Sequence, residues 1–457
     1  MKIRINPPRN AGSVLITSLI ITAILGITLA SYLMMVSTQA ISVNRSQAWN
    51  AAIAVTEAGV EEALAQINRN APFFDPADAT NGLTANYWTQ NGNVFRAPRR
   101  YLGQHYYDVT ITLNSLRPYI NSTGTVWMAS SYSHNNTTPV NPTALFATVG
   151  TSDDSHGTYQ VRRVLVNTKI DPMFAVAMAA ISTIDLKGNN VTTDSFDSGD
   201  PLYNIGGLYP FGHPSMVKSN GDVCTDAAIV NSINVGNANI WGKAKTGPNG
   251  TVAVGPGGYV TGGIADDFDV TFPPVRLPST TWWWLDNGNY TYEGVSFKHR
   301  ILASGDYYLN SLAGGIFIQT NVTARLLLLG NTKITGNSDE IRIAPGAKLS
   351  MFVNGSSFSM AGKGVVNYPG NAYNFLYYGT PNNTSVSFNG NASFTGAVYA
   401  PGAAFSLGGG GNDFYDFVGA SVSLTVVMNG HYHFHYDEAL RNWGPGKGFV
   451  PTRWTEL

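Results

Sequence analysis

A long apolar run lies near the start of the chain. From Val14 to Val36 there is neither a charged residue nor a proline. A helix rises about 1.5 Å per residue, so this run is long enough to cross the ~30 Å hydrocarbon core of a membrane. It is too long for the apolar region of a cleaved secretory signal, which spans roughly 7–15 residues. We therefore predict a membrane-spanning helix.

The polarity pattern changes after this run without a break in helical spacing. The apolar residues Trp49, Ile53, Val60, Leu64 and Ile67 fall on one helical stripe, with polar residues between them. A proline soon afterwards ends the pattern. These positions predict a single helix over residues 13–68, apolar in its first half and amphipathic in its second. The stripe is the predicted contact with a head domain.

Alternation of apolar and polar residues follows the helix. It occupies residues 107–113, 126–128 and 161–166, and a period of two is typical of half-buried strands. We predict a small antiparallel sheet in a head domain over residues 69–170, packed against the amphipathic part of the helix. The Asn-, Thr- and Ser-rich stretch 121–157 is predicted to be mostly loop.

From residue 171 a recurring unit predicts a mainly β architecture of another kind. In each copy an apolar strand runs into Gly or Gly-Asn and out into another short strand. The copies lie at residues 184–189, 233–240, 327–334, 351–355, 386–394 and 426–430. Each has too few apolar residues for a core of its own, so we expect them to stack as a right-handed β-solenoid (β-helix) over residues 171–442. The Pro- and Trp-rich stretch 269–287 should cross the solenoid face or cap an end, and residues 443–457 should form a C-terminal tail.

Composition narrows the classes of function. Lys and Arg number 27 against 28 Asp and Glu, a formal net charge of −1, which argues against nucleic-acid binding. Charged residues make up only 12 % of the chain and glycines number 49, as expected of many short strands joined by sharp turns. The single cysteine, Cys224, excludes an intramolecular disulfide and is predicted to be buried. The basic residues Lys2, Arg4 and Arg9 before the apolar run predict a cytoplasmic N-terminus and an exported remainder.

The N-terminal region resembles type IV pilin precursors. Residues 9–17 (RNAGSVLIT) look like a prepilin leader that ends at Gly12, with Ser13 as the first mature residue. Residues 56–64 (TEAGVEEAL) resemble a segment of minor pilins with a PilX-type N-terminal domain. The resemblance implies a leader peptide over residues 1–12, processing by a prepilin peptidase, and contacts with other pilin-like subunits.

Two differences from most major pilins limit the kind of pilin that this chain resembles. Most major pilins carry a glutamate where this chain has Thr17, and they commonly have a proline in the first helix, which is absent here. The resemblance therefore implies a minor or pseudopilin-like subunit, or a pilin-like anchor that does not polymerise.

The second half of the chain also resembles a known domain. Residues 301–309, 340–349, 394–401 and 434–440 are similar to the C-terminal β-helical domain, of unknown function, found behind PilX-type N-termini in bacterial surface proteins. The resemblance spans residues 171–442. It implies a β-helix at the cell surface and supplies no chemistry.

Alternating histidines are the strongest metal candidates. His431, His433 and His435 alternate in sequence, so in a strand they point to one side while the aromatic residues between them point to the other. Histidines at this spacing can bind zinc when a third ligand converges, and Asp437 or Glu438 is nearby. The alternative is a last strand whose aromatic rings close the core and whose histidines lie at the surface. We assign no metal and keep the three histidines as candidates.

Two groups of carboxylates are candidates for acid–base chemistry. Asp266, Asp267 and Asp269 form one, and Asp194 and Asp197 form the other. Glycosidic chemistry needs two carboxyl groups about 5–9 Å apart, whereas Asp in Gly- and Pro-bounded loops is also a common turn residue. The glycine run late in the chain lacks the lysine and the following helix of a phosphate loop. We expect no catalytic residue and no cofactor.

Three consecutive tryptophans, Trp282, Trp283 and Trp284, are candidates for contact with a polysaccharide or another surface, as are Trp241, Tyr290 and Tyr292. Indole rings combine a large apolar face with a polar N–H group, which suits sugars and protein interfaces alike. A tryptophan run beside prolines can equally pack as a cap on the fold.

Together these features predict a non-enzymatic, minor-pilin-like bacterial surface protein. Its N-terminal helix should cross the inner membrane once and take part in type IV pilus or pseudopilus assembly, tip decoration or adhesion. The expected partners are the inner membrane, prepilin peptidase, other pilin-like subunits and a polysaccharide or host-surface ligand, but not nucleic acid. Two alternatives stay open: a single-pass anchored envelope adhesin that does not polymerise, and a surface-tethered carbohydrate-active β-helix enzyme.

Overall fold

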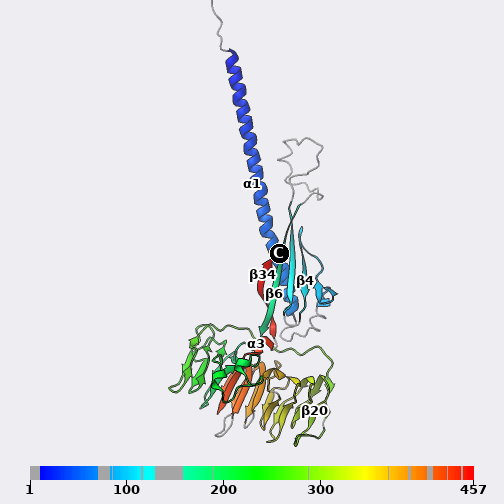
Figure 1. The fold of residues 1–457 in the computed structure, drawn as a ribbon, viewed down its shortest axis with the longest axis vertical. Helices are drawn as coiled ribbons and strands as arrows, with labels where there is room; N and C mark the ends of the chain where they lie inside the picture. Colours follow the sequence, from blue (N-terminus) through cyan, green and yellow to red (C-terminus); the bar gives the residue numbers. More distant parts are fainter. Residues whose placement is uncertain are drawn as a thin grey trace, which may run out of the picture. The chain divides into compact units, whose positions relative to one another are not determined.

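The computed structural model describes most of the chain. The described residues are 11–69, 83–84, 86–114, 117–128, 158–188, 190–286, 288–368, 370–389, 393–408, 415–429, 431–443 and 446–457. The protein is mainly β, with a long N-terminal helix, an antiparallel sheet and parallel sheets (Figure 1). The chain forms two compact units: one comprises Met1–Gln66, Leu83–Lys169 and Pro451–Leu457, and the other comprises Ile67–Gly82 and Ile170–Val450.

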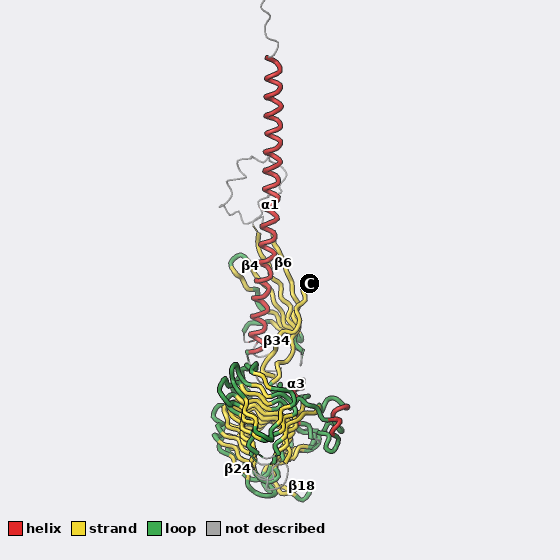
Figure 2. Tube along the Cα trace, turned by 90° about the vertical axis from the view of Figure 1, so that its left-hand side faces the viewer, coloured by secondary structure: helices red, strands yellow, loops and turns green. Residues whose placement is uncertain are grey.

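The predicted N-terminal helix is confirmed. Helix α1 (Ala11–Asn68) begins slightly before the predicted residue 13 and ends at the predicted residue 68. It runs without a break through the apolar and the amphipathic parts (Figure 2). The continuity follows from the sequence, because neither a proline nor a capping glycine interrupts the helical pattern.

The first unit contains a sheet with the strand order β1-β2-β4-β5-β6-β34, and β3 pairs with β4. Its strands are β1 (Thr89–Asn91), β2 (Val94–Arg96), β3 (Arg100–Leu102), β4 (His105–Thr112), β5 (Tyr119–Met128), β6 (Thr158–Pro172) and β34 (Gly446–Glu456). The three predicted strands are confirmed as β4, β5 and β6. The prediction of loop over residues 121–157 is wrong for 121–128, which belong to β5, and residues 129–157 lie outside the described residues.

Small residues and part of the predicted apolar stripe form the buried face of α1. Val60 and Ile67 of the stripe are buried, but Trp49 is 44 % exposed, and Ile53 and Leu64 are only half-buried. The buried residues along this face are Ala48, Ala52, Val55, Thr56, Val60, Ala63 and Ile67. Small side chains allow the helix to approach the sheet closely, and this closeness places the larger apolar residues at the flanks of the contact.

The closest approach joins Thr56 of α1 to strand β5. The Gly124 amide donates to Thr56 Oγ1 at 3.1 Å, and Ser122 Oγ donates to the Thr56 carbonyl at 2.8 Å. Buried polar groups need such partners. The inner face of β5 carries Ser and Gly, so it lacks the period-two apolar pattern of a strand: hydrogen bonds and close backbone packing replace the apolar side chains.

Replacing Gly124 with alanine is expected to destabilise the first unit by about 1–3 kcal/mol, because overpacking forces the helix and the strand apart. A Cβ atom would lie 2.6 Å from the Thr56 nitrogen and 2.7 Å from the Ala52 carbonyl oxygen, and these backbone atoms cannot rotate away. Chemical denaturation of the full chain in detergent measures the loss. Gly288→Ala is the control, because a Cβ there would meet nothing within 4 Å. Equal midpoints for the two variants would contradict the close packing.

The second unit begins with ten short strands. They are β7 (Met178–Ala180), β8 (Ile184–Asp185), β9 (Thr192–Phe196), β10 (Val223–Thr225), β11 (Ile233–Gly236), β12 (Asn239–Ile240), β13 (Ala244–Lys245), β14 (Val252–Val254), β15 (Tyr259–Val260) and β16 (Ile264–Ala265). The short 3-10 helices η2 (Pro201–Tyr203) and η3 (Pro214–Met216) lie in the long connection between β9 and β10. Each strand pairs in parallel with strands from a later or earlier turn of the chain.

A second run of strands follows in the same unit. It comprises β17 (Trp283–Trp284), β18 (Tyr290–Tyr292), β19 (Val295–Phe297), β20 (His299–Ile301), β21 (Gly305–Leu309), β22 (Ile316–Ile318), β23 (Thr323–Leu328), β24 (Thr332–Ile334), β25 (Glu340–Ile343), β26 (Lys348–Val353), β27 (Ser357–Met360), β28 (Gly364–Asn367), β29 (Phe375–Gly379), β30 (Ser385–Asn389), β31 (Phe394–Gly408), β32 (Tyr415–Met428) and β33 (Tyr432–Asp437). Helices η4 (Ala372–Asn374) and α3 (Leu440–Trp443) are short. Apart from the β18–β19 hairpin, these strands also pair in parallel.

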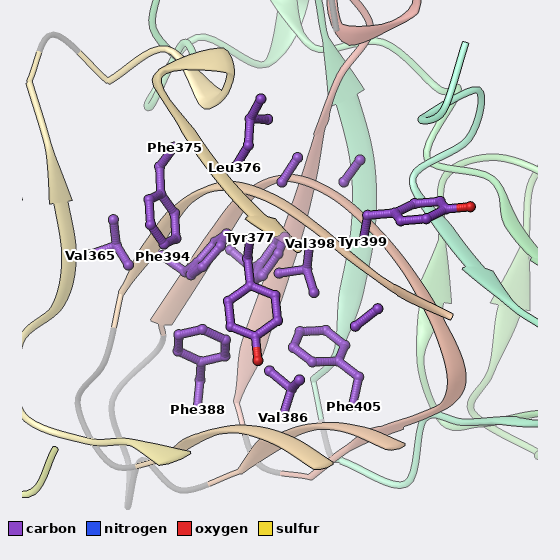
Figure 3. Close-up of a cluster of buried hydrophobic side chains, with 14 of the residues drawn as sticks. Val365, Phe375, Leu376, Tyr377, Val386, Phe388, Phe394, Val398, Tyr399 and Phe405 are labelled. Atoms are coloured by element: carbon purple, nitrogen blue, oxygen red, sulfur yellow. The ribbon is translucent and has the colours of Figure 1, made fainter. Parts of the chain in front are cut away.

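The predicted recurring units lie in register with one another. Val426 pairs with Ile184, which in turn pairs with Ile233, and Val386 pairs with Phe405. All five side chains are buried. Figure 3 shows Val386 and Phe405 beside further rings of the same core. Paired parallel strands from distant parts of the sequence therefore place these buried side chains side by side, and Cys224 is buried in the same unit, as predicted.

The order of the paired strands in the sheet differs from their order in the sequence. The late strand β32 pairs in parallel with the early strands β7 and β8, and β33 pairs with β9. We call this contact the junction. The early strands (green in Figure 1) extend the stack on one side of the junction, and the strands from β20 onward (olive to orange) extend it on the other.

Residues 266–282 connect the two sides of the junction. The Val270 amide donates to Asp226 Oδ1 at 3.3 Å, just after β10, and the Tyr399 hydroxyl of β31 donates to the Pro273 carbonyl at 2.7 Å. Because β10 and β31 lie on opposite sides of the junction, this connection crosses the face of the stack. For the Pro- and Trp-rich stretch 269–287, the sequence predicted either such a crossing or a cap at one end.

The predicted C-terminal tail, residues 443–457, is instead largely strand β34. This strand lies beside β6 in the sheet of the first unit, and the Leu457 amide donates to the Arg163 carbonyl at 3.0 Å. The chain thus leaves the first unit after β6 and returns to it in β34, so the second unit is inserted between two neighbouring strands. The sequence carries no local signal for β34, because its partner strand β6 lies far away in the sequence.

Candidate functional site

The apolar part of α1 is exposed along its whole length. Val14 is 67 % exposed, Val36 is 42 % exposed, and none of the most apolar window of the helix is buried. Hydroxyl groups within this part are satisfied locally: Thr22 donates to the Ser18 carbonyl at 2.7 Å and Thr28 to the Ile24 carbonyl at 3.0 Å. The segment has the length and polarity of a single membrane-spanning helix, and in water it would leave a large apolar surface uncovered.

The predicted processing residues lie at the start of this helix. Gly12 and Ser13 belong to the first turn of α1. The Ser13 side chain lies outside the described part of the chain, as do residues 1–10 of the predicted leader. Cleavage after Gly12 therefore stays a prediction.

A buried histidine lies at the junction between two carboxylates. His435 of β33 is 4 % exposed; its Nδ1 lies 2.7 Å from Asp194 Oδ1 of β9, and its Nε2 lies 3.1 Å from Asp416 Oδ1 of β32. The parallel register explains the meeting, because Asp194 pairs with His435 and Asp416 pairs with His433. The Tyr209 ring stacks on His435 with centroids 3.7 Å apart, and the Tyr209 hydroxyl donates to Asp194.

His433 joins this group. Asp416, His433 and His435 offer donor atoms that all lie within 4.8 Å of one another, and His433 Nδ1 lies 3.6 Å from Asp416 Oδ1. Predicted candidate His431 precedes β33 and does not belong to this group. Three aromatic residues of this strand, Tyr432, Phe434 and Tyr436, are buried, as the alternative interpretation predicted. The same interpretation placed the histidines at the surface, which is wrong for the buried His435.

The surroundings of this group favour a positive charge. Burial lowers the pKa of His435, but its hydrogen bonds to Asp194 and Asp416 outweigh burial and raise the pKa above its ordinary value. Burial raises the pKa of Asp416, yet its bonds to His433 and His435 outweigh that effect and hold the pKa well below the usual range. The lowered pKa keeps Asp416 ionised beside the imidazole, and Asp194 contacts the other ring nitrogen.

The carboxylates that the sequence offered as companions of the histidines bind elsewhere. Asp437 accepts hydrogen bonds from the Ser198 amide and hydroxyl, at 3.1 and 2.7 Å. Glu438 accepts from Ser195 Oγ of β9 at 2.8 Å and from Lys218 Nζ at 2.6 Å. Both carboxylates therefore fasten the end of β33 to segments on the other side of the junction.

The tryptophan run divides between core and surface. Trp282 packs against the core with its ring 6.0 Å from that of Phe352, whereas Trp283 and Trp284 are 66 % and 47 % exposed. Trp284 lines a cavity of about 480 Å³ near the β17 end of the stack. The polar side chains around this cavity belong to Asn289, Lys298, His299, Asn310 and Ser311.

The carboxylate groups proposed for acid–base chemistry have structural partners. Asp267 pairs with Lys245 at 3.0 Å, and Asp194 binds His435 and Tyr209. Asp197 accepts from the Gly199 amide at 2.9 Å within its own turn. These contacts are those of turn and bridging residues, and the expectation that the chain is not an enzyme stays a prediction.

Comparison with known proteins adds two similarities. The model of a domain of unknown function (DUF7305) matches residues 286–443, which run from β18 to α3. Among solved structures, the chain is similar to the competence-associated pilin ComZ from Thermus thermophilus, at 11 % sequence identity and a TM-score of 0.26, over 89 % of this chain and 96 % of that chain. No curated protein matches the chain.

Proposed function

We propose that this chain is a non-enzymatic, minor-pilin-like subunit that carries a large surface domain. The observation that carries the proposal is the uncovered apolar half of α1, from Val14 to Val36, in one continuous helix with the half packed on the sheet. Such a helix can be held by the inner membrane and can exchange lipid for the apolar helices of neighbouring subunits. The basic residues before it favour a cytoplasmic N-terminus.

The second unit is proposed to be a right-handed β-solenoid that the first unit displays. Support comes from parallel ladders in which each turn of the chain adds its apolar residues to the same columns. Right-handedness is the expectation for parallel crossover connections. Insertion between β6 and β34 leaves both ends of the inserted domain on one sheet, as suits a domain added to a complete head.

Assembly is proposed to begin with cleavage after Gly12 by a prepilin peptidase, which leaves Ser13 as the first residue. Other pilin-like subunits then pack against the apolar half of α1. Thr17 in place of the usual glutamate favours a minor position in an assembly, such as the tip, over that of the bulk subunit. Display at a tip would suit adhesion.

Two other functions compete with this one. A single-pass anchored adhesin would use the same helix only as an anchor and would stay in the membrane. A surface-tethered carbohydrate-active enzyme would require converging carboxylates, and the contacts of Asp194, Asp197 and Asp267 with structural partners favour the non-enzymatic function.

Shearing of cells tests the proposal. In the producing bacterium, the protein is expected in the sheared surface fraction, and it should disappear from that fraction in a strain without prepilin peptidase. Another membrane-anchored protein with an exported domain serves as the control, because its presence in the sheared fraction would reveal lysis. Equal amounts in the sheared fraction with and without the peptidase would contradict assembly as a pilin-like subunit.

A second function, sugar binding, is favoured by the cavity beside Trp284. The half-exposed indole and the polar side chains around it combine a stacking surface with hydrogen-bonding groups. On a glycan array, Trp284→Ala is expected to weaken the binding of the full chain roughly 3- to 10-fold, which corresponds to about 0.5–1.5 kcal/mol for one ring contact. Trp454→Ala, which removes an exposed tryptophan of the first unit, is the control. Equal losses in both variants, or no glycan bound at all, would exclude this site.

A further inference from the structure

We propose that Asp416, His433 and His435 form a zinc site at the junction, with Asp194 as the residue that orients His435. The three donors come from neighbouring strands, β32 and β33, whose parallel register places them side by side. Neither the proposed assembly function nor the similarity to other proteins implies a metal here.

The distances between the donors fit a tetrahedral ion. Zinc binds imidazole nitrogen at about 2.0–2.1 Å and carboxylate oxygen at about 2.0–2.2 Å, so two ligand atoms of a tetrahedron lie about 3.3–3.4 Å apart. Asp416 Oδ1 lies 3.1 Å from His435 Nε2 and 3.6 Å from His433 Nδ1. The His433 and His435 nitrogens lie within 4.8 Å of each other. Two of the three separations therefore lie within a few tenths of an ångström of the tetrahedral value, and the third is bounded by 4.8 Å.

Asp194 supplies what a histidine ligand needs on its far side. Metal-bound histidines usually donate their second ring N–H to a carboxylate, which fixes the tautomer and the ring orientation. His435 Nδ1 meets Asp194 Oδ1 at 2.7 Å, which leaves Nε2 for the metal. The stacked Tyr209 ring holds the imidazole plane, and its hydroxyl in turn bonds Asp194. A carboxylate and a stacked aromatic ring therefore fix the orientation of the His435 imidazole.

The site has an open side. The side chains of His433 and Asp416 are 30 % and 33 % exposed, whereas that of His435 is 5 % exposed. Three protein ligands leave one position of a tetrahedron for water or for a donor from another molecule. Imidazole and carboxylate ligands together suit zinc and other divalent transition ions better than calcium or magnesium, which prefer oxygen ligands alone.

The position of the site gives the metal a structural role. The ligands belong to the late strands, but the orienting Asp194 belongs to β9 on the other side of the junction. Zinc binding and the pairing of the two sides are therefore coupled: an ion that requires the oriented His435 stabilises the state in which β9 and β33 are paired.

Metal analysis of the full chain tests this proposal. The protein is purified in detergent without a polyhistidine tag, stripped with chelator, equilibrated with zinc and desalted. We expect one zinc per chain, a zinc-dependent rise in the unfolding midpoint, and, with cobalt in place of zinc, the visible absorption bands of a tetrahedral site. Absence of retained zinc would overturn the proposal.

Variants assign the ligands. His433→Ala should lower zinc affinity by at least about 10-fold, whereas His431→Ala, which removes an imidazole just before β33, should leave affinity unchanged. Asp416→Asn keeps the side-chain volume and should also weaken binding if His433→Ala proves difficult to fold. Asp194→Asn should weaken binding about 10–100-fold, as is typical for the loss of an orienting carboxylate. Zinc retained equally by His433→Ala and Asp416→Asn would overturn this assignment.

Discussion

Replacing Glu438 with alanine is expected to destabilise the second unit by about 3 kcal/mol, the lower end of the cost of breaking a buried ion pair. The Glu438 carboxylate is 8 % exposed and accepts hydrogen bonds from Ser195, Lys218 and Asn220. Its removal leaves the Lys218 ammonium, which is only 23 % exposed, without its counter-charge. Urea denaturation of the full chain in detergent, followed by near-UV circular dichroism, measures the loss.

The same carboxylate predicts how stability depends on pH. Burial alone would raise the pKa of Glu438, but the hydrogen bonds from Lys218, Asn220 and Ser195 outweigh burial and lower it. A lowered pKa stabilises the folded state above the ordinary value of about 4.5, and this stabilisation is lost as the pH falls through the folded value. Glu438→Gln should therefore flatten the acid side of the stability profile.

A surface ion pair is the matched control. Lys187 pairs with Asp185 at 2.8 Å, but the Lys187 side chain is 63 % exposed. Lys187→Ala is expected to change stability by less than about 1 kcal/mol, because exposed pairs contribute little. If Glu438→Ala were no more destabilising than Lys187→Ala, the polar contacts across the junction would not hold its two sides together.

Phe417→Ala is the second substitution with a large expected effect, about 3–5 kcal/mol of lost stability. The Phe417 ring lies between two parallel rings, 4.4 Å from Phe394 and 4.4 Å from Phe434, and these three residues pair across β31, β32 and β33. Alanine would leave a cavity in the middle of this stack, which cannot collapse because the backbones on both sides are fixed by the ladder.

Leu424→Ala in the same strand is the control for Phe417→Ala. Leu424 is 37 % exposed, so its truncation should change stability by no more than about 0.5 kcal/mol. Differential scanning calorimetry of the full chain compares the two variants. A loss below 1 kcal/mol for Phe417→Ala would contradict a continuous core through the strands at the junction.

Local patterns in the sequence were sufficient to predict much of the fold. The apolar run and the helical spacing after it predicted α1, and period-two alternation predicted β4, β5 and β6. The recurring Gly-Asn units predicted that residues such as Val426 and Ile184 occupy equivalent buried positions, which the register confirms. Each of these features depends on neighbours within a few residues, and such patterns remain visible without knowledge of the tertiary structure.

Features that depend on distant parts of the chain could not be predicted. The pairing of β32 with β7 joins residues whose separation in sequence carries no local mark, and the same holds for β34 beside β6. The contact of α1 with the sheet was misjudged because Thr56 and Gly124 achieve close packing with hydrogen bonds and small atoms, whereas hydropathy patterns weigh only large apolar side chains.

The histidine cluster likewise combines a feature visible in the local sequence with contacts from other strands. The spacing of His433 and His435 marked the strand as a candidate, but their carboxylate partners were sought next to them in sequence. The structure brings Asp416 and Asp194 to them from β32 and β9 instead. Asp416 arrives through the pairing of the consecutive strands β32 and β33, whereas Asp194 arrives through the junction, whose non-sequential register leaves no local signal in the sequence.

The central claim is that α1 enters an assembly after processing at Gly12. The most direct test is the N-terminal sequence, by mass spectrometry, of the protein recovered separately from sheared surface material and from membranes. The account predicts a chain that begins at Ser13 in the sheared fraction. A chain that still begins at Met1 and is confined to membranes would contradict it and would leave the helix as an anchor only.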